Sequence, residues 1–172
     1  GPGRMAEPED VFARCLELLG ADGPLRGRRV LVSAGGTREP LDSVRFVGNR
    51  SSGKMGVAVA REARRRGAEV TLVASNLAVP PPDGVEVVQA PSAADLAREV
   101  LDRGDADVVV MAAAVADYRP AEPTDGKRPK DSDLWTIDLQ PTEDVLAELG
   151  RRRRNGQILV GFAADEGEAG LV

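Results

Sequence analysis

The run GNRSSGKMG at residues 48–56 combines glycines, two hydroxyls and a lysine at the start of a predicted helix. A helix N-terminus exposes backbone N–H groups and carries the positive end of the helix dipole, so these groups and the Lys54 ammonium converge on one anion site. The run matches the first part of the phosphate-binding loop G-x-x-x-x-G-K, but Met55 stands where a Mg²⁺-binding serine or threonine is required. The sequence therefore predicts an anion site that is not that of an ordinary P-loop ATPase. A helix that is merely capped is the alternative.

Small residues follow two predicted strands, at points where a ligand can approach the backbone. Gly35 and Gly36 end the first strand, and without side chains their N–H groups can come close to a phosphate or a base. A tight turn explains these glycines equally well. The segment Ala112–Ala114 follows the fourth strand and leaves room for a flat ligand, with Asp117 as a hydrogen-bond acceptor at the rim. Close packing, with Asp117 capping a helix, is the alternative there.

A basic cluster, GKRPK at residues 126–130, lies inside a stretch rich in proline and charge at residues 119–133. That composition predicts a long mobile loop, and such loops are usually functional. Lys127 and Lys130 are two of the three lysines among 23 basic residues, and a compact ammonium suits phosphate oxygens. We therefore expect a flap that closes over a phosphate group, with a solvated surface loop as the alternative.

Alternating short strands and helices position these segments. Strands are predicted at residues 28–33, 69–74, 85–89, 107–113, 135–139 (an edge strand) and 157–164. Helices are predicted at residues 8–20, 53–66, 92–101 and 142–153, the last with Thr142 as its cap. Because the strands are mostly apolar throughout, the sequence predicts a three-layer, Rossmann-like α/β fold with a mostly parallel sheet and a long flap loop. Ligands in such folds bind beyond the carboxyl ends of the strands, where Ser33–Thr37, Ala112–Tyr118 and Phe162–Glu166 would lie.

A dinucleotide site is weighed and disfavoured. Such a site needs G-x-G-x-x-G between the first strand and its helix, and an acidic residue at the end of the second strand. Here the glycine-rich helix start lies far from the first strand, and the second strand ends in Ala74-Ser75-Asn76. An NAD(P)-dependent reductase is kept only as a rival function.

The composition removes several classes of chemistry. The chain of 172 residues contains no histidine and one cysteine, Cys15. This excludes Ser-His-Asp and Cys-His catalysis, histidine metal sites, an internal disulfide and multi-cysteine zinc sites, and leaves Mg²⁺ held by oxygens as the favoured metal. The net charge of −5 argues against nucleic-acid or membrane-surface partners. No apolar run approaches the ~20 residues of a membrane span, and residues 1–7 lack the apolar core of a signal peptide, so we expect a cytoplasmic protein.

Four motifs in order carry a resemblance to a known family. They are NRSSGKMG at 49–56, AAAVADY at 112–118, KRPK at 127–130 and GFAA at 161–164. Together they closely resemble phosphopantothenate–cysteine ligase, the second module of bacterial coenzyme A biosynthesis. Residues 1–7 resemble the tail of the flavin-dependent decarboxylase often fused before it, so FMN is expected only in that module. The resemblance implies a ligase domain at 8–172 that is incomplete at its carboxyl end, because the family continues with a lysine-bearing helix and a further strand.

The resemblance implies a CTP-dependent ligation. The carboxylate of 4′-phosphopantothenate attacks the α-phosphate of CTP and releases pyrophosphate; the amine of cysteine then attacks the acyl-cytidylate and releases CMP. Two polyanions must be brought together, so charge neutralisation and alignment are the main tasks of the site. Lysines, Mg²⁺ and a helix N-terminus suit those tasks. Family members generally pair as dimers, and a non-catalytic nucleotide-binding module is a second rival function.

The resemblance also assigns residues. Asn49 is expected to contact the acyl-cytidylate and assist its reaction with cysteine, and Lys127 is expected to be the essential flap lysine. Pro129 replaces the middle lysine of the family's Lys-x-Lys-Lys flap, so Lys127 and Lys130 are aligned with the outer two. The CTP site is expected at Ala113, Ala114, Asp117, Lys127, Lys130, Thr142, Glu143, Asp144, Val145 and Phe162. The phosphopantothenate site is expected at Gly35, Gly36, Thr37, Asn49, Ser51, Ser52, Gly53 and Lys54.

Overall fold

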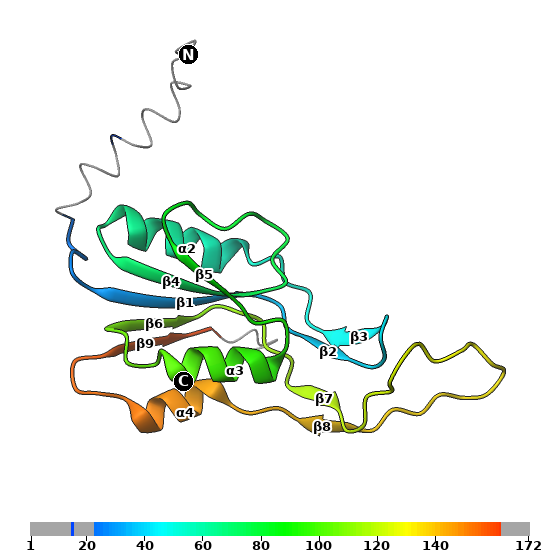
Figure 1. Cartoon of the computed structure of the whole chain (residues 1–172). Coiled ribbons are helices and arrows are strands. Elements are labelled where there is room, and N and C mark those ends of the chain that lie inside the picture. Colours follow the sequence, from blue (N-terminus) through cyan, green and yellow to red (C-terminus); the bar gives the residue numbers. More distant parts are fainter. Residues whose placement is uncertain (1–14, 16–22, 163–172) are drawn as a thin grey trace, which may run out of the picture.

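The computed structural model describes residues 15 and 23–162, and its centre is a five-stranded sheet (Figure 1). The strands are β1 (Arg29–Gly35), β4 (Glu69–Ser75), β5 (Glu86–Gln89), β6 (Val108–Met111) and β9 (Ile158–Gly161). They lie in the order β5-β4-β1-β6-β9, and every neighbouring pair is parallel. The predicted parallel sheet is therefore confirmed.

Helices cover both faces of this sheet (Figure 1). Helix α2 (Lys54–Arg65) lies on one face, and α3 (Ala93–Asp102) and α4 (Val145–Arg152) lie on the other. Successive side chains of β1 point to opposite layers, because strand side chains alternate. Val32 packs in the apolar cluster that includes α2, whereas Leu31 packs in the cluster that includes α3 and α4. The predicted three-layer α/β fold is confirmed.

The helix starts differ in how they are capped. Helix α3 begins as predicted: the Ser92 hydroxyl oxygen accepts from the N–H of Asp95 at 3.2 Å, and the Asp95 carboxylate accepts in return from the N–H of Ser92 at 3.4 Å. The prediction that Thr142 caps α4 is wrong. Asp144 caps that helix by accepting from the N–H of Ala147 at 2.9 Å, because the helix begins only at Val145.

Two short hairpins form an arm that we define as residues 38–48 and 118–141. Strands β2 (Arg38–Pro40) and β3 (Phe46–Gly48) pair antiparallel, and so do β7 (Tyr118–Pro120) and β8 (Leu139–Pro141). The arm lies beyond the carboxyl ends of β1 and β6 (Figure 1). The strand predicted at 135–139 is wrong in position, because β8 begins where that prediction ends. Three-residue strands are too short to show a periodicity in sequence.

Some predictions fall outside the described residues. The helix predicted at 8–20 does so except for Cys15, which is exposed. Ala163 and Ala164 of the last predicted strand, and the boundary predicted after residue 7, also lie outside. No helix in the described part of the chain is long and apolar enough to cross a bilayer.

The carboxylates of the helices predict how stability depends on pH. Hydrogen bonds from Arg65 and Arg66 lower the pKa of Glu62 to about 2, from an ordinary 4.5. The pKa of Glu148 is lowered in the same way by two arginines of its own helix. A depressed carboxyl pKa stabilises the fold fully above the unfolded pKa, and that stability is lost as the pH falls through the folded pKa. We therefore expect the melting temperature to fall by several degrees on acidification from pH 5 towards pH 2.

Circular dichroism melts across that range measure this pH dependence. The double variant Glu62→Gln, Glu148→Gln should have a shallower slope below pH 5, because an amide has no proton to gain. An identical slope in both proteins would show that these ion pairs do not set the acid limb.

Candidate functional site

The carboxyl ends of β1 and β6 are joined directly. The N–H of Ala114 donates to the carbonyl of Gly35 at 2.7 Å, and the N–H of Thr37 donates to the carbonyl of Ala114 at 3.2 Å. The Thr37 hydroxyl oxygen then accepts from the N–H of Ala116 at 2.9 Å. The two small-residue segments therefore lie side by side at the edge where parallel sheets bind their ligands.

Glycines bring helix α2 against the end of β1. Gly35 and Gly53 have φ values of 95° and 77°, in the left-handed region that favours glycine. A Cβ on Gly53 would lie 2.3 Å from Cδ2 of Leu77 and 3.1 Å from the nitrogen of Gly35. A Cβ on Gly35 would lie 1.8 Å from the carbonyl oxygen of Ser75. This close packing places the N-terminus of α2 beside the strand ends.

The N-terminus of α2 has the features that a bound anion needs. Its cap residue Gly53 has no side chain, and the first turn of α2 contains no acidic residue. The hydroxyl oxygens of Ser51 and Ser52 lie 3.4 and 3.5 Å from the backbone nitrogens of Gly53 and Lys54. The Lys54 side chain is exposed. The positive end of the dipole is therefore not neutralised by the helix's own first turn.

Asn49 and Thr142 reach the end of β6 from two different loops. The Asn49 amide donates through Nδ2 to the carbonyl of Val115 at 2.9 Å. The N–H of Thr142 donates to the carbonyl of Asp117 at 2.9 Å. Its hydroxyl donates to the carbonyl of Ala116 at 2.6 Å. Residues predicted for the acyl-cytidylate and for CTP therefore meet around one loop.

Other members of the predicted CTP site differ in what their side chains do. Val145 is buried in the core, and the Asp144 carboxylate caps α4, so both side chains serve the fold. Asp117 and Glu143 are exposed, and Phe162 follows β9 with 54% of its surface exposed.

The flap lysines lie in the arm. Lys127 and Lys130 are both exposed. Two backbone hydrogen bonds, of 2.9 and 3.2 Å, join the flap segment 124–128 to the loop 41–45 between β2 and β3. The flap is thus attached to the hairpin loop, and this attachment could not be deduced from the flap sequence.

Sequence reasoning missed Asp42, which is buried at 5% exposure. Burial of this carboxyl raises its pKa, but hydrogen bonds from the backbone N–H groups of Arg45, Val44 and Arg128, and from the Arg45 side chain, outweigh burial. The pKa of Asp42 therefore lies well below its usual range. The sequence signal is the aspartate that opens the turn D-S-V-R at residues 42–45, because aspartate favours such turns.

Asn76 was missed as well. It is the one non-glycine residue with a positive φ, 47°, in the described part of the chain. Its amide donates through Nδ2 to the carbonyls of Gly36 and Pro91, both at 2.9 Å. Asn76 therefore holds the end of β1 to the loop after β5. Asparagine tolerates this backbone conformation, so its place at a strand end was the available signal.

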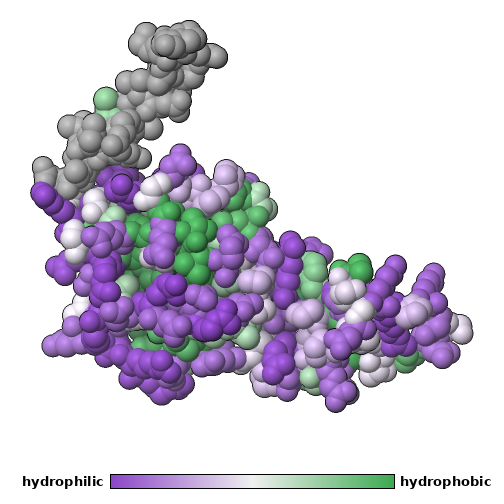
Figure 2. All heavy atoms as spheres, in the orientation of Figure 1, coloured by the Kyte–Doolittle hydropathy of each residue, from purple (hydrophilic) through white to green (hydrophobic). Residues whose placement is uncertain are grey.

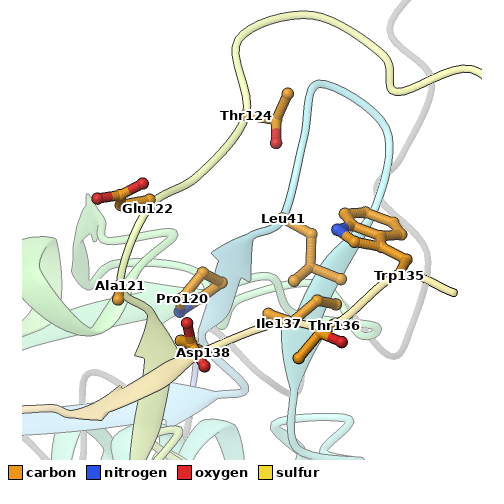
Figure 3. Close-up of a pocket in the computed structure, with 9 residues that line it drawn as sticks. All are labelled: Leu41, Pro120, Ala121, Glu122, Thr124, Trp135, Thr136, Ile137 and Asp138. Atoms are coloured by element: carbon orange, nitrogen blue, oxygen red, sulfur yellow. The ribbon is translucent and has the colours of Figure 1, made fainter.

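A pocket of about 260 Å³ lies within the arm (Figure 3). Its walls come from both hairpins and from the flap, and its apolar lining residues include Trp135 and Leu41. The lining residues are Leu41, Pro120, Ala121, Glu122, Thr124, Trp135, Thr136, Ile137 and Asp138. None of the predicted site residues lines this pocket, so the predicted site is the open edge of the sheet and not this cavity.

The described residues do not fit a protein-held metal. No three histidine, cysteine, aspartate or glutamate side chains gather within residues 23–162 or at residue 15. A Mg²⁺ ion that the resemblance implies would therefore rest mainly on nucleotide phosphate oxygens and water, and not on a cluster of side chains in the described residues.

Residues 25–170 match the model of one protein family, the DNA/pantothenate metabolism flavoprotein C-terminal domain. The chain belongs to this family. The coenzyme A biosynthesis bifunctional protein CoaBC of Mycobacterium tuberculosis (strain ATCC 25618 / H37Rv) is 49% identical over 181 residues. That match covers 98% of this chain and 43% of the relative, so the chain spans less than half the length of this curated relative.

Solved structures agree with this family assignment. The crystal structure of the C-terminal domain of a CoaBC protein is 44% identical, with a TM-score of 0.68, over 82% of this chain and 66% of that one. A Cab2 mutant in complex with phosphopantothenate-cysteine has a TM-score of 0.68 at 16% identity, over 97% of this chain and 74% of that one. The second likeness shows the fold alone. The resemblance to the ligase module of the bifunctional family proteins, stated from four short motifs, is confirmed.

Proposed function

We propose that this domain joins 4′-phosphopantothenate to L-cysteine at the expense of CTP, in the cytoplasm, as a step of coenzyme A biosynthesis. One observation carries the proposal: the ends of β1 and β6 and the N-terminus of α2 meet at one edge of the sheet, in a family whose 49%-identical member is named for coenzyme A biosynthesis. The Cab2 mutant that shares this fold was solved with phosphopantothenate-cysteine bound.

The proposed reaction has two balanced steps. A carboxylate oxygen of 4′-phosphopantothenate attacks the α-phosphorus of CTP, and the bond to pyrophosphate breaks. The amine of cysteine then attacks the acyl carbon, the bond to CMP breaks, and the amine loses a proton as the amide forms. A carboxylate is a poor electrophile until a good leaving group is attached, which is why the nucleotide is needed. Each step places anions side by side, so the site must supply positive charge and alignment.

The residues divide between the two substrates. The segments Gly35–Thr37 and Ser51–Lys54 line the phosphopantothenate site, and the N-terminus of α2 and one ammonium hold its phosphate. The N–H groups of Gly36 and Thr37 already donate to the carbonyls of Ser75 and Ala114, so these two residues allow close approach and do not donate to the ligand. The loop after β6, with Asp117, Glu143 and Phe162 around it, holds the nucleotide. Asn49 lies between these two groups because it donates to the carbonyl of Val115. That position suits a side chain which must contact the acyl-cytidylate after the first step.

The arm supports a proposed homodimer. Several large apolar side chains of the arm are exposed, and Figure 2 shows apolar residues interspersed with hydrophilic ones in that part of the molecule. They are Val44, Phe46, Tyr118, Leu134, Ile137 and Leu139. Exposed apolar side chains gathered on one projection are typical of an interaction surface. Sedimentation equilibrium measures this association.

In the parent protein we also propose a fused flavin-dependent decarboxylase module, to which FMN belongs.

A thermal-shift panel tests the proposed function against its rivals. The chain is melted with CTP, ATP and NADPH, each with and without Mg²⁺. A ligand at 100 times its Kd stabilises a protein by about 2.7 kcal/mol, so CTP should raise the melting temperature clearly. Stabilisation by NADPH and not by CTP would instead favour a reductase. Stabilisation by CTP without product formation in a longer protein that carries the domain would favour a non-catalytic nucleotide-binding module.

Base selectivity gives a sharper prediction. Cytosine has an exocyclic amine where uracil has a carbonyl, and the loop after β6 exposes the Asp117 carboxylate as an acceptor. A hydrogen bond to a charged group contributes about 1.5–3 kcal/mol, so CTP should bind roughly ten- to a hundredfold more tightly than UTP. Isothermal titration calorimetry measures both affinities, and equal affinities would contradict a cytosine-specific pocket at this loop.

A further inference from the structure

Lys127 lies between two fixed points of the flap backbone. On one side, the carbonyl of Gly126 accepts from the backbone of the loop between β2 and β3 at 3.2 Å. On the other side, the N–H of Arg128 donates to the Asp42 carboxylate at 3.2 Å, and the Arg128 carbonyl accepts from Nη2 of Arg45 at 2.7 Å. The backbone on both sides of Lys127 is therefore held, while its side chain is exposed.

The two oxygens of Asp42 have separate tasks. Oδ1 accepts from the N–H groups of Val44 and Arg45, at 2.8 and 2.7 Å, and so closes the hairpin loop. Oδ2 accepts from Nε of Arg45 at 2.9 Å and from the N–H of Arg128 in the flap, and it forms an ion pair with Nη2 of Arg45 at 2.6 Å. One buried carboxylate thus shapes the loop with one oxygen and ties the flap to it with the other.

Trp135, which lies between the flap and β8, packs against the cluster formed by Asp42, Arg45 and Arg128. The guanidinium carbons of Arg45 and Arg128 lie 4.6 and 4.9 Å from the centroid of its ring, within the range of cation–π attraction. Both arginines are the ones that Asp42 organises. Trp135 is the only tryptophan of the chain, so its fluorescence reports on this cluster.

We propose that Asp42 is a positioning residue that presents Lys127 to the triphosphate of the bound nucleotide. The inference deepens the proposed function and rests on it, since it takes CTP as the ligand. The exposed lysine meets the phosphates, and Asp42 fixes the backbone from which that lysine extends. A flap held in place before the ligand arrives loses less entropy on binding than a free loop does.

The variant Asp42→Asn keeps the size and shape of the side chain but removes its charge and one of its two acceptor oxygens. An amide has one acceptor, so it can satisfy only one of the two donor sets that the carboxylate now satisfies. The other set then faces an NH2 group, and the charge that held Arg45 is gone. Glu62→Gln is the matched control, because it also removes a carboxylate that binds two arginines, Arg65 and Arg66, but on helix α2 and outside the arm.

Two measurements on the 172-residue chain follow the flap itself. In Asp42→Asn, acrylamide should quench Trp135 fluorescence more strongly, and trypsin should cleave after Lys127 about tenfold faster, since cleavage follows local opening. Glu62→Gln should leave both rates unchanged. If Asp42→Asn changes neither readout, the flap is held without Asp42 and the inference is overturned.

Calorimetry with CTP and CMP then separates positioning from mere folding. The Asp42→Asn variant should bind CTP about tenfold more weakly, because it loses an aligned charged hydrogen bond to the triphosphate. Its affinity for CMP, which lacks the β- and γ-phosphates, should change by less than about twofold. The double variant Asp42→Asn, Lys127→Ala should bind CTP no more weakly than Lys127→Ala alone, because groups that act through one another are not additive.

The outcomes distinguish the two proposals. If the unmodified chain binds neither nucleotide, the proposed function fails and this inference falls with it. If the unmodified chain binds CTP, but Asp42→Asn weakens CTP and CMP equally or adds its full effect to that of Lys127→Ala, the proposed function stands and the inference alone is overturned.

Discussion

Asn49→Asp, in a longer protein that carries this domain, should separate the two steps of the ligation. Pyrophosphate release should continue while formation of the product falls by about a hundredfold or more, the size of effect seen when a donor to a developing charge is lost. The acyl-cytidylate should accumulate. The change keeps the shape of the side chain but replaces a donor with a negative charge, at the place where anions must gather.

The hydrogen bond of Asn49 gives a second reason why Asn49→Asp should impair the ligation. The Asn49 amide donates to the carbonyl of Val115 at 2.9 Å, and a carboxylate at that position faces the carbonyl oxygen with no proton between them. Mass spectrometry of quenched reactions, together with a pyrophosphate assay, measures both steps. Equal loss of both steps would remove Asn49 from the second one.

Asn76→Asp is the matched control for this experiment. Asn76 also donates from its amide to backbone carbonyls near the site, those of Gly36 and Pro91. Losing that link loosens the end of β1 without placing a charge between the substrates. Asn76→Asp should therefore lower both steps together, and an accumulation of acyl-cytidylate in it would show that any loosened strand end produces the effect.

Gly35→Ala should strongly destabilise the fold. A Cβ at Gly35 would lie 1.8 Å from the carbonyl oxygen of Ser75, and that oxygen is fixed because it accepts from the N–H of Gly36 at 2.8 Å. The backbone must shift at the point where β1, β4 and β6 meet. We expect a loss of about 4 kcal/mol or more in the free energy of unfolding, the size reserved for severe local disruption.

Gly27→Ala isolates the part of this loss that is due to the contact. Gly27 has a φ of 71°, close to the left-handed value of Gly35, but a Cβ there would meet nothing within 4 Å. It should cost only the conformational strain, about 1–2 kcal/mol. Urea denaturation followed by circular dichroism measures both variants. Equal losses in the free energy of unfolding would mean that position 35 requires glycine because of its positive φ, and not because of the contact with Ser75.

The central sheet and its helices were predictable because their signals are local. The segment Val108–Met111 is apolar and contains three β-branched valines, and it forms the largely buried strand β6. Ser92 and Asp95 carry the sequence signature of a helix start and form it. The capping of α4 was missed because Thr142 and Asp144 are both good caps, and only the tertiary hydrogen bond from Thr142 to Ala116 decides between them.

The arm was not predictable because its structure depends on contacts between distant segments. Asp42 and Arg128 are far apart in sequence, and neither looks unusual alone. Trp135 suggested a strand by its type, but its ring packs against two arginines instead, and β8 forms further along where Leu139 can pair with Pro120. For the candidate site, the small residues after the predicted strands were enough to predict that the glycines and the loop after β6 lie at one edge of the sheet. The hydrogen bond from Asn49 to the carbonyl of Val115 could be seen only in the structure.

The pairing of β1 with its neighbours also determines when the site can exist during synthesis. Val30 of β1 pairs with Val70 of β4 and with Val108 of β6, so one half of the site emerges from the ribosome long before the other. Pairings between distant segments form late, because closing a long loop costs entropy before any contact repays it. A nascent chain that has made β1, α2 and β4 already displays the glycines and Lys54 but has no loop after β6 to complete them. The proposed site is therefore complete only once β6 has paired with β1.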